Sequence, residues 1–279
     1  MLHIGRIEYA NCTPMFHALR AHFPCDDYTF TEGVPSYLNS LLFAGRIDVC
    51  PSSSFEYALH PERYCILPNL SISSVGPVLS VMLFSRLPIE DLHGQNVLLS
   101  ADSATSVNLL KILMTKRFGC DCSYGVSAQS LDDGLKEAPA MLLIGDAALR
   151  AVCRNPDVYR YDLGSLWHEW TGLPFVFALW LCTREAVETK AGALRLLAER
   201  LKQCKLTAAA ERDLIAAISP DAEWMGTQRL ISYWRDNISY DLSAQHRAGL
   251  RHFFQLSAEL GLLPTAPRLN MFGREDEGA

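Results

Sequence analysis

Long apolar runs are missing from this 279-residue sequence, and their absence argues against a membrane-spanning helix. No window holds the roughly 18 consecutive apolar residues that such a helix needs. The first residues, MLHIGRIEYANC, also lack the basic segment, the apolar core and the small-residue cleavage site of a signal peptide. We therefore expect a cytoplasmic protein that has no membrane partner.

Paired cysteines and clustered basic residues are missing as well. The nine cysteines are an odd number, and the C-x-C spacing of Cys120 and Cys122 matches neither a redox motif nor a zinc site. The 25 basic residues are scattered among 31 acidic ones, so no surface for nucleic acid is indicated. We expect reduced, mostly buried thiols, no metal and no nucleic-acid partner. An anionic ligand would have to be bound largely by neutral donors and helix N-termini.

The common catalytic motifs are also absent. The sequence contains no G-x-G-x-x-G, no G-x-x-x-x-G-K, no H-E-x-x-H and no G-x-S-x-G. This absence predicts a protein without a cofactor. Among eight histidines the most suggestive base is His168, in LWHEWTGLP, but a histidine among aromatic residues more often packs than reacts.

What the sequence does contain is an alternation of short apolar runs and helix signals, typical of α/β proteins. Hydrophobic residues make up 49% of the chain and charged residues 20%, enough for large cores. HIGRIEY predicts a first strand, and Thr13 with Pro14 predicts the start of a helix directly after it. Ser36 is expected to cap a second helix, and Ser53 with Glu56 has capping-box spacing.

Two long apolar segments, PVLSVMLFS and LPFVFALWLCT, are expected to cross between two lobes. The first lobe would comprise residues 1–86 and 183–279, with helices at its C-terminal end, and the second lobe residues 87–182. This is the layout of a type II periplasmic-binding-protein-like fold, whose ligand cleft lies between the lobes. The last residues, GREDEGA, are expected to form a loose tail.

Polar residues gather where the predicted strands give way to helices. Such corners present hydroxyls and free backbone N–H groups to a carboxylate. The same residue types also cap helices for purely structural reasons. The candidate substrate-binding residues are Ser52, Ser53, Ser103, Thr105, Ser106, Gly145 and Asp146, with Asn11 at the first corner.

Seven segments, in order along the chain, resemble the chorismate dehydratases of menaquinone biosynthesis. They are GRIEYANCTP, GVPSYLNSLLFAGRID, PSSSFEYA, LPNLSISSVGPVLSVMLFS, LSADSATSVNLLKILM, LLIGDAAL and YDLGSLWHEWTGLPFVFALW. The resemblance runs to about residue 182 and is looser in the C-terminal helices, where GLRHFFQLSAELGLL is similar. One departure is Ala10, because many members of the family have leucine there.

The resemblance implies a solute-binding-protein fold and an enzyme of the futalosine route that converts chorismate to 3-[(1-carboxyvinyl)oxy]benzoate and water. It also implies that Asn11 is the catalytic residue, and that the partner is a small dianionic substrate. The trans oxygen substituents of chorismate favour a stepwise elimination, and our hypothesis is that the enolpyruvyl carboxylate of the substrate, held by Asn11, is the base. No particular oligomeric state is predicted.

Two other functions stay open at this point. The sister enzyme of the pathway, 1,4-dihydroxy-6-naphthoate synthase, shares the fold but opens with a corner that resembles S-P-C-P-N-D-T and uses a histidine base. YANCTP departs from that pattern, and no histidine lies between His93 and His168. The second alternative is a cytoplasmic solute-binding sensor without catalysis, because fold alone does not fix function.

Overall fold

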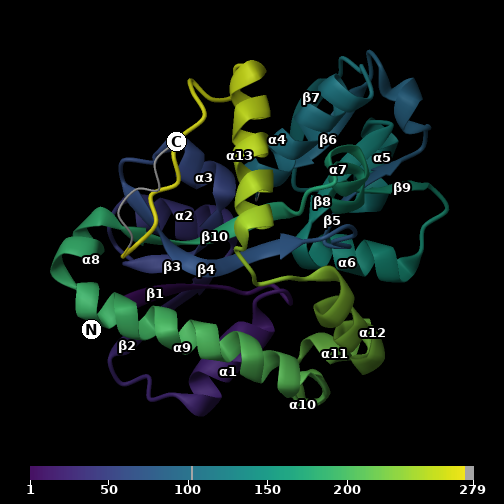
Figure 1. Ribbon diagram of the computed structural model, residues 1–279. Coiled ribbons are helices and arrows are strands. Elements are labelled where there is room, and N and C mark those ends of the chain that lie inside the picture. Colours follow the sequence, from purple (N-terminus) through teal and green to yellow (C-terminus); the bar gives the residue numbers. More distant parts are fainter. Residues whose placement is uncertain (102, 274–279) are drawn as a thin grey trace.

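The chain folds into two five-stranded sheets with helices packed around them (Figure 1). The structure is a computed structural model that describes residues 1–101 and 103–273. The predicted tail GREDEGA lies outside the described residues except for Gly273. Strand order is β2-β1-β3-β10-β4 in the first sheet and β7-β6-β8-β5-β9 in the second. The predicted α/β class is confirmed.

The first sheet is mostly parallel, with one antiparallel strand inserted from late in the chain. β1 pairs in parallel with β2 and β3, and β10 runs antiparallel between β3 and β4. In the register, Leu2 lies opposite Tyr28 and Ala178 lies opposite Ser53. The strands of this sheet are β1 (Leu2–Ile7), β2 (Tyr28–Gly33), β3 (Val49–Ser53), β4 (Tyr64–Ser74) and β10 (Phe175–Thr183).

The second sheet has the same mixture of pairings. β6 pairs in parallel with β7 and β8, whereas β5 runs antiparallel to β8 and β9. β8 is buried at all five residues, as its unbroken apolar sequence AMLLI requires. The strands are β5 (Val81–Ser85), β6 (Asn96–Ser100), β7 (Ser123–Ser127), β8 (Ala140–Ile144) and β9 (Tyr159–Asp162).

The chain changes sheets earlier than the sequence predicts. β5, in PVLSVMLFS, lies wholly in the second sheet, and β10, in LPFVFALWLCT, lies wholly in the first. The crossings are therefore residues 75–80 and 172–174, ahead of the predicted lobe boundaries at 86 and 182. The two-lobe division itself stays a prediction. An apolar strand buried on both faces carries no local signal for the sheet that it joins.

Asp162 fixes the first crossing. Its carboxylate accepts the N–H of Ser165 and so begins helix α7 (Leu163–Thr171). The same carboxylate accepts the N–H groups of Val78, at 3.0 Å, and Leu79, at 2.6 Å. Leu79 has a φ of +58°, which an L-residue rarely adopts. The carboxylate therefore holds the crossing chain in a conformation that it would not keep by itself.

Several helix starts follow the sequence prediction. Helix α1 begins at Thr13, with Pro14 in its first turn, but the predicted N-cap role of Thr13 is wrong, because Cys12 is the N-cap residue and no side chain caps the helix. Ser53 caps α3, as predicted, by accepting the N–H of Glu56. The predicted Ser36 cap is wrong, because α2 begins at Pro35 and its N-cap residue Val34 makes no side-chain cap. The helices of the first half are α1 (Thr13–His22), α2 (Pro35–Phe43) and α3 (Ser54–Leu59). The second half adds η1 (Ile89–Leu92), α4 (Ala104–Ile112), η2 (Leu113–Arg117), α5 (Leu131–Glu137), α6 (Gly145–Arg154) and α7.

The C-terminal helices return to the first sheet and bridge the two halves. They are α8 (Arg184–Thr189), α9 (Ala191–Ala210), α10 (Arg212–Ile218), α11 (Asp221–Met225), α12 (Thr227–Ser232), η3 (Tyr233–Asn237) and α13 (Ala244–Glu259). In Figure 1, α9 lies along α1, and α13 stands at the junction of the two halves. Phe253 of α13 packs edge-on against Phe175 of β10 and Trp167 of α7. This aromatic cluster ties α13 to both halves.

Two expectations about the whole chain can be compared with the structure. All nine cysteines are free, and six of them are buried, as predicted. Within residues 1–101 and 103–273, no helix has the length and apolar character needed to cross a membrane.

Candidate functional site

A cavity opens between the two halves, at the ends of their strands. Its empty volume is about 560 Å³, the open mouth included. Both halves contribute polar corners to its wall, next to apolar side chains of the crossing and of β10. The lining residues are Ile7, Tyr9, Asn11, Pro35, Ser53, Ile72, Val78, Ser80, Val81, Ser103, Ser106, Ile144, Gly145, Phe177 and Ala178. Five of the eight sequence-predicted site residues are among them: Asn11, Ser53, Ser103, Ser106 and Gly145.

The other three predicted residues lie behind this wall and not in it. The Ser52 hydroxyl is fully buried and donates to the Asn39 side chain at 2.7 Å. Thr105 is fully buried as well, and its hydroxyl serves other protein groups. The Asp146 carboxylate accepts the N–H of Ala10 at 3.0 Å. The structure therefore gives these residues supporting positions instead of the predicted direct contact with a ligand.

Thr105 joins the two halves beside the cavity. Its hydroxyl lies 2.6 Å from the Ser53 hydroxyl and 3.3 Å from that of Ser54, and it accepts the N–H of Phe55 at 3.1 Å. Thr105 belongs to α4, whereas its partners belong to β3 and α3. These buried contacts fix how the N-terminus of α4 meets the N-terminus of α3, and thus the spacing of the cavity's hydroxyls.

Asn11 lies between β1 and α1, as the sequence predicts, and lines the cavity. Its side-chain oxygen Oδ1 is shielded from solvent and has no hydrogen-bond partner among the described residues. A buried polar atom without a partner is costly, so native proteins keep few of them. A ligand in the cavity would supply the missing partner.

The corner at Gly145, where β8 turns into α6, approaches the Asn11 corner closely. Gly145 has a φ of +57°, and its N–H donates to the carbonyl of Ser80 at 2.8 Å. A Cβ at this position would lie 2.7 Å from the ring of Tyr9. Only glycine therefore allows the Tyr9 ring to rest against this peptide and form one wall of the cavity.

Hydroxyl groups and a helix N-terminus provide the polar part of the opposite wall. Ser103 caps α4 by accepting the N–H of Ser106 at 3.2 Å, and the two hydroxyls lie 3.0 Å apart. Both residues line the cavity. The N-terminal end of α4 thus faces the cavity and favours negative charge there.

Of the ten lining residues that were not predicted from the sequence, three have polar or aromatic side chains: Tyr9, Ser80 and Phe177. Tyr9 lies two residues after the end of β1 and close to Asn11 in sequence, and this position was the signal that could have identified it. Ser80 belongs to the crossing segment and Phe177 to β10, where nothing local distinguishes them from core residues. His168 does not line the cavity, and its ring nitrogen Nδ1 contacts the carbonyl of Leu173.

Charge is missing from the cavity wall as far as the structure describes it. Among residues 1–101 and 103–273, the lining has no acidic, basic or histidine side chain. The same residues hold no group of three or more His, Cys, Asp and Glu side chains able to bind a metal ion. An anion bound in this cavity would depend on hydroxyl, amide and backbone N–H donors.

Asp146 is a buried carboxylate that hydrogen-bonds to the Asn11 corner through the N–H of Ala10. Burial raises the pKa of Asp146 to about 6, and repulsion from Asp221 adds to the effect, while the Ala10 N–H opposes it. Between about pH 4 and pH 6 the folded protein keeps a proton that the unfolded chain loses. The free energy of unfolding therefore falls as pH rises through this window.

We expect Asp146→Asn to remove this pH dependence, because the amide oxygen can still accept the Ala10 N–H. A shift of about two pKa units corresponds to at most about 3 kcal/mol, and partial exposure reduces it to about 1–2 kcal/mol. The variant should match the wild type near pH 4 and exceed its unfolding free energy at pH 7. Urea titrations followed by tryptophan fluorescence at pH 4, 5.5 and 7 measure the difference.

Asp133→Asn is the matched control. Asp133 is exposed, and its hydrogen bond with Lys136 holds the pKa below the ordinary value. This variant should gain no stability at pH 7. A constant difference between wild type and Asp146→Asn at all three pH values would contradict the prediction.

Comparisons with known proteins place these features in a wider context. A family model described as menaquinone biosynthesis matches residues 2–259. A chorismate dehydratase of Thermus thermophilus is 32% identical over 95% of this chain and 96% of its own length. A chorismate dehydratase of Campylobacter jejuni is 33% identical over 65% of this chain and 67% of its own length.

Solved structures with low sequence identity share the fold. A protein from Archaeoglobus fulgidus aligns with a TM-score of 0.77 at 18% identity, over 94% of this chain and 98% of that one. The periplasmic aliphatic sulphonate-binding protein of Escherichia coli aligns with a TM-score of 0.69 at 15% identity, over 100% of this chain and 94% of that one. The predicted periplasmic-binding-protein-like fold is thereby confirmed.

Proposed function

The chain belongs to the menaquinone-biosynthesis family, it is similar to the chorismate dehydratases of Thermus thermophilus and Campylobacter jejuni, and we propose that it converts chorismate to 3-[(1-carboxyvinyl)oxy]benzoate and water. The observation that supports this best is the cavity itself. It combines the Asn11 amide with the hydroxyls of Ser53, Ser80, Ser103 and Ser106. Neutral donors of this kind suit a compact dianion that must be held and oriented.

The stereochemistry of chorismate favours a stepwise reaction. Its two oxygen substituents are trans on neighbouring ring carbons, so the hydrogen that leaves from one carbon lies on the same face as the hydroxyl that leaves from the other. An anti elimination is therefore ruled out. The hydrogen is acidified through the conjugated ring carboxylate, and its loss produces an extended anion. The hydroxyl then takes up the proton removed in the first step and leaves as water, which gives the aromatic ring.

The substrate itself offers a base in the right place. The enolpyruvyl carboxylate is attached through an ether oxygen to the carbon that loses its hydrogen, and it can take the proton within the molecule. Asn11 can donate from its amide nitrogen to this carboxylate, and its unpaired Oδ1 can accept once the carboxylate carries the proton. Orientation of this kind converts a slow bimolecular step into an intramolecular one.

The opposite wall would hold the ring carboxylate, where negative charge builds up in the first step. Ser103 and Ser106 at the N-terminus of α4 provide hydroxyl groups and a positive helix end. Fixed donors aimed at developing charge need no reorganisation during the reaction. Ser52, Thr105 and Asp146 act behind them by holding the strand ends and corners in place.

Incubation of the purified protein with chorismate, without added metal or cofactor, tests the proposal. We expect the ultraviolet spectrum to change to that of a benzoate and the product mass to fall by one water. Unchanged chorismate would reject it. Cyclic dehypoxanthine futalosine would then be the next substrate to assay, and binding of chorismate without turnover would support a sensor.

A further inference from the structure

The backbone of the Asn11 corner is held by side chains from the far end of the chain. Trp234, in η3, donates its indole N–H to the carbonyl of Ala10 at 2.8 Å. Tyr240 donates its hydroxyl to the carbonyl of Asn11, also at 2.8 Å. Asp146 accepts the N–H of Ala10 from the other side. Three side chains thus hold three consecutive peptide units next to the cavity.

This arrangement matters because the Asn11 side chain has little else to direct it. Its Oδ1 atom has no hydrogen-bond partner among the described residues. The position of the amide therefore follows the position of the backbone that carries it. A rotation of the Asn11 peptide would turn the amide away from a bound ligand, and no hydrogen bond of Oδ1 to a described residue would oppose this rotation.

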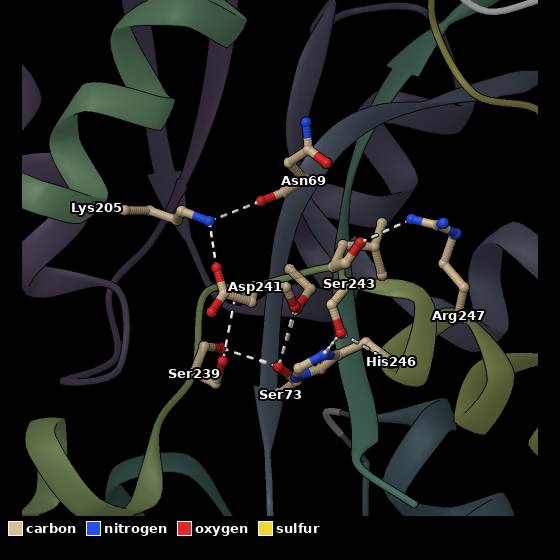
Figure 2. A network of polar contacts seen from close by, with 10 residues as sticks. Asn69, Ser73, Lys205, Ser239, Asp241, Ser243, His246 and Arg247 are labelled. Atoms are coloured by element: carbon tan, nitrogen blue, oxygen red, sulfur yellow. Dashed lines mark hydrogen bonds and ion pairs between the residues drawn. The ribbon is translucent and has the colours of Figure 1, made fainter.

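The segment that carries Tyr240 is itself firmly attached to the first sheet (Figure 2). Ser239 and Ser73 exchange two backbone hydrogen bonds at 2.8 and 2.9 Å, and the carbonyl of Tyr240 accepts the N–H of Ser71 at 3.0 Å. Next to it, Lys205 donates to the carboxylate of Asp241 and to the carbonyl of Asn69. Tyr240 therefore reaches Asn11 from a rigid support on β4.

The Tyr240 hydroxyl stays protonated, and so remains a hydrogen-bond donor, at neutral pH. Burial raises the pKa of Tyr240 well above its ordinary value, so the hydroxyl keeps its proton throughout the neutral range. The carbonyl of Asn11 can only accept. Tyr240 is therefore always the donor and the Asn11 carbonyl always the acceptor. A variant that lacks the hydroxyl has no other group at this position to make the hydrogen bond.

We propose that Tyr240 is a positioning residue for the dehydration, and that its hydroxyl holds the Asn11 peptide so that the Asn11 amide is oriented before chorismate binds. The proposal rests on the proposed function. Tyr240 does not line the cavity, so it makes no direct contribution to substrate binding. Its effect is on the chemical step, where small misplacements of a catalytic group are costly.

The test compares Tyr240→Phe with Tyr57→Phe. Tyr57 is fully buried, and its hydroxyl likewise donates to a backbone carbonyl, that of Arg268, away from the cavity. Both variants should lose a few degrees of melting temperature. Only Tyr240→Phe should lower kcat with chorismate, by about tenfold, with KM within about twofold of the wild type, the signature of a lost transition-state interaction. Hydrogen exchange of a peptide covering residues 8–13 should be faster in Tyr240→Phe only.

The outcomes separate the two proposals. A wild-type protein that releases no water from chorismate rejects the proposed function, and the role of Tyr240 in the reaction is rejected with it. Wild-type turnover, combined with equal kcat values for Tyr240→Phe and Tyr57→Phe, rejects the positioning role alone. Equal exchange rates of the corner peptide in both variants would reject it as well.

Discussion

Asn11→Ala is expected to lower kcat with chorismate by about 10²–10³-fold while leaving the fold intact. The magnitude is that of removing one preorganised donor from a site that stabilises developing charge. Stability should not fall, because the Asn11 Oδ1 atom has no hydrogen-bond partner among the described residues. Removal of a buried polar group without a partner is neutral or stabilising. Activity and stability therefore respond in different directions.

Initial rates from the ultraviolet change, together with thermal unfolding, measure both quantities. Asn270→Ala is the matched control, because its amide donates to the carbonyl of Pro61 outside the cavity. This control should lose stability and keep its kcat. An Asn11→Ala variant with wild-type kcat, or one whose activity falls only in parallel with its melting temperature, would contradict a catalytic role for Asn11.

Local signals predicted most of the elements that carry the site. Thr13 and Pro14 place the start of α1, and so place Asn11 between a strand and a helix. The strand in NVLLS has the predicted bounds, and the Gly145 turn joins β8 to α6 as expected. These features depend on residues close together in sequence. The family resemblance, which was drawn from the same segments, is confirmed by the match over residues 2–259.

Side-chain direction explains why two of the predicted site residues, Ser52 and Thr105, lie behind the cavity wall. Ser52 and Ser53 are neighbours at the end of β3, and consecutive side chains of a strand point to opposite faces. Thr105 and Ser106 are neighbours on α4, where successive side chains point about 100° apart. Which member of each pair faces the ligand depends on register and helix rotation. Packing sets both, so the local pattern could not decide them.

Contacts between distant parts of the chain could not be predicted either. The sheet that β5 or β10 joins depends on strands far away in sequence. The same holds for Trp234 and Tyr240, which bond to Ala10 and Asn11 across more than 220 residues. The C-terminal helices resemble the family only loosely in sequence. Their contribution to the site becomes visible only once the chain is folded.

Gly145→Ala is expected to damage both stability and activity, because two separate effects meet at this residue. Its φ of +57° costs an L-residue about 1–2 kcal/mol. A methyl group would also lie within 3 Å of three atoms of the Tyr9 ring. Since protein interiors are close-packed, the ring must move, and with it one wall of the cavity. We expect a loss of about 2–4 kcal/mol in unfolding free energy and at least a tenfold loss in kcat/KM.

Gly172→Ala separates the two effects. Gly172 has a φ of +69°, but a Cβ at this position would meet no atom within 4 Å. This control should therefore show the backbone strain alone, about 1–2 kcal/mol, with unchanged kinetics. Urea unfolding and chorismate turnover, measured on both variants, give the steric contribution of Tyr9 as the difference between them. Equal losses of stability and equal kinetics would mean that the Tyr9 ring yields freely and that Gly145 is needed only for its backbone conformation.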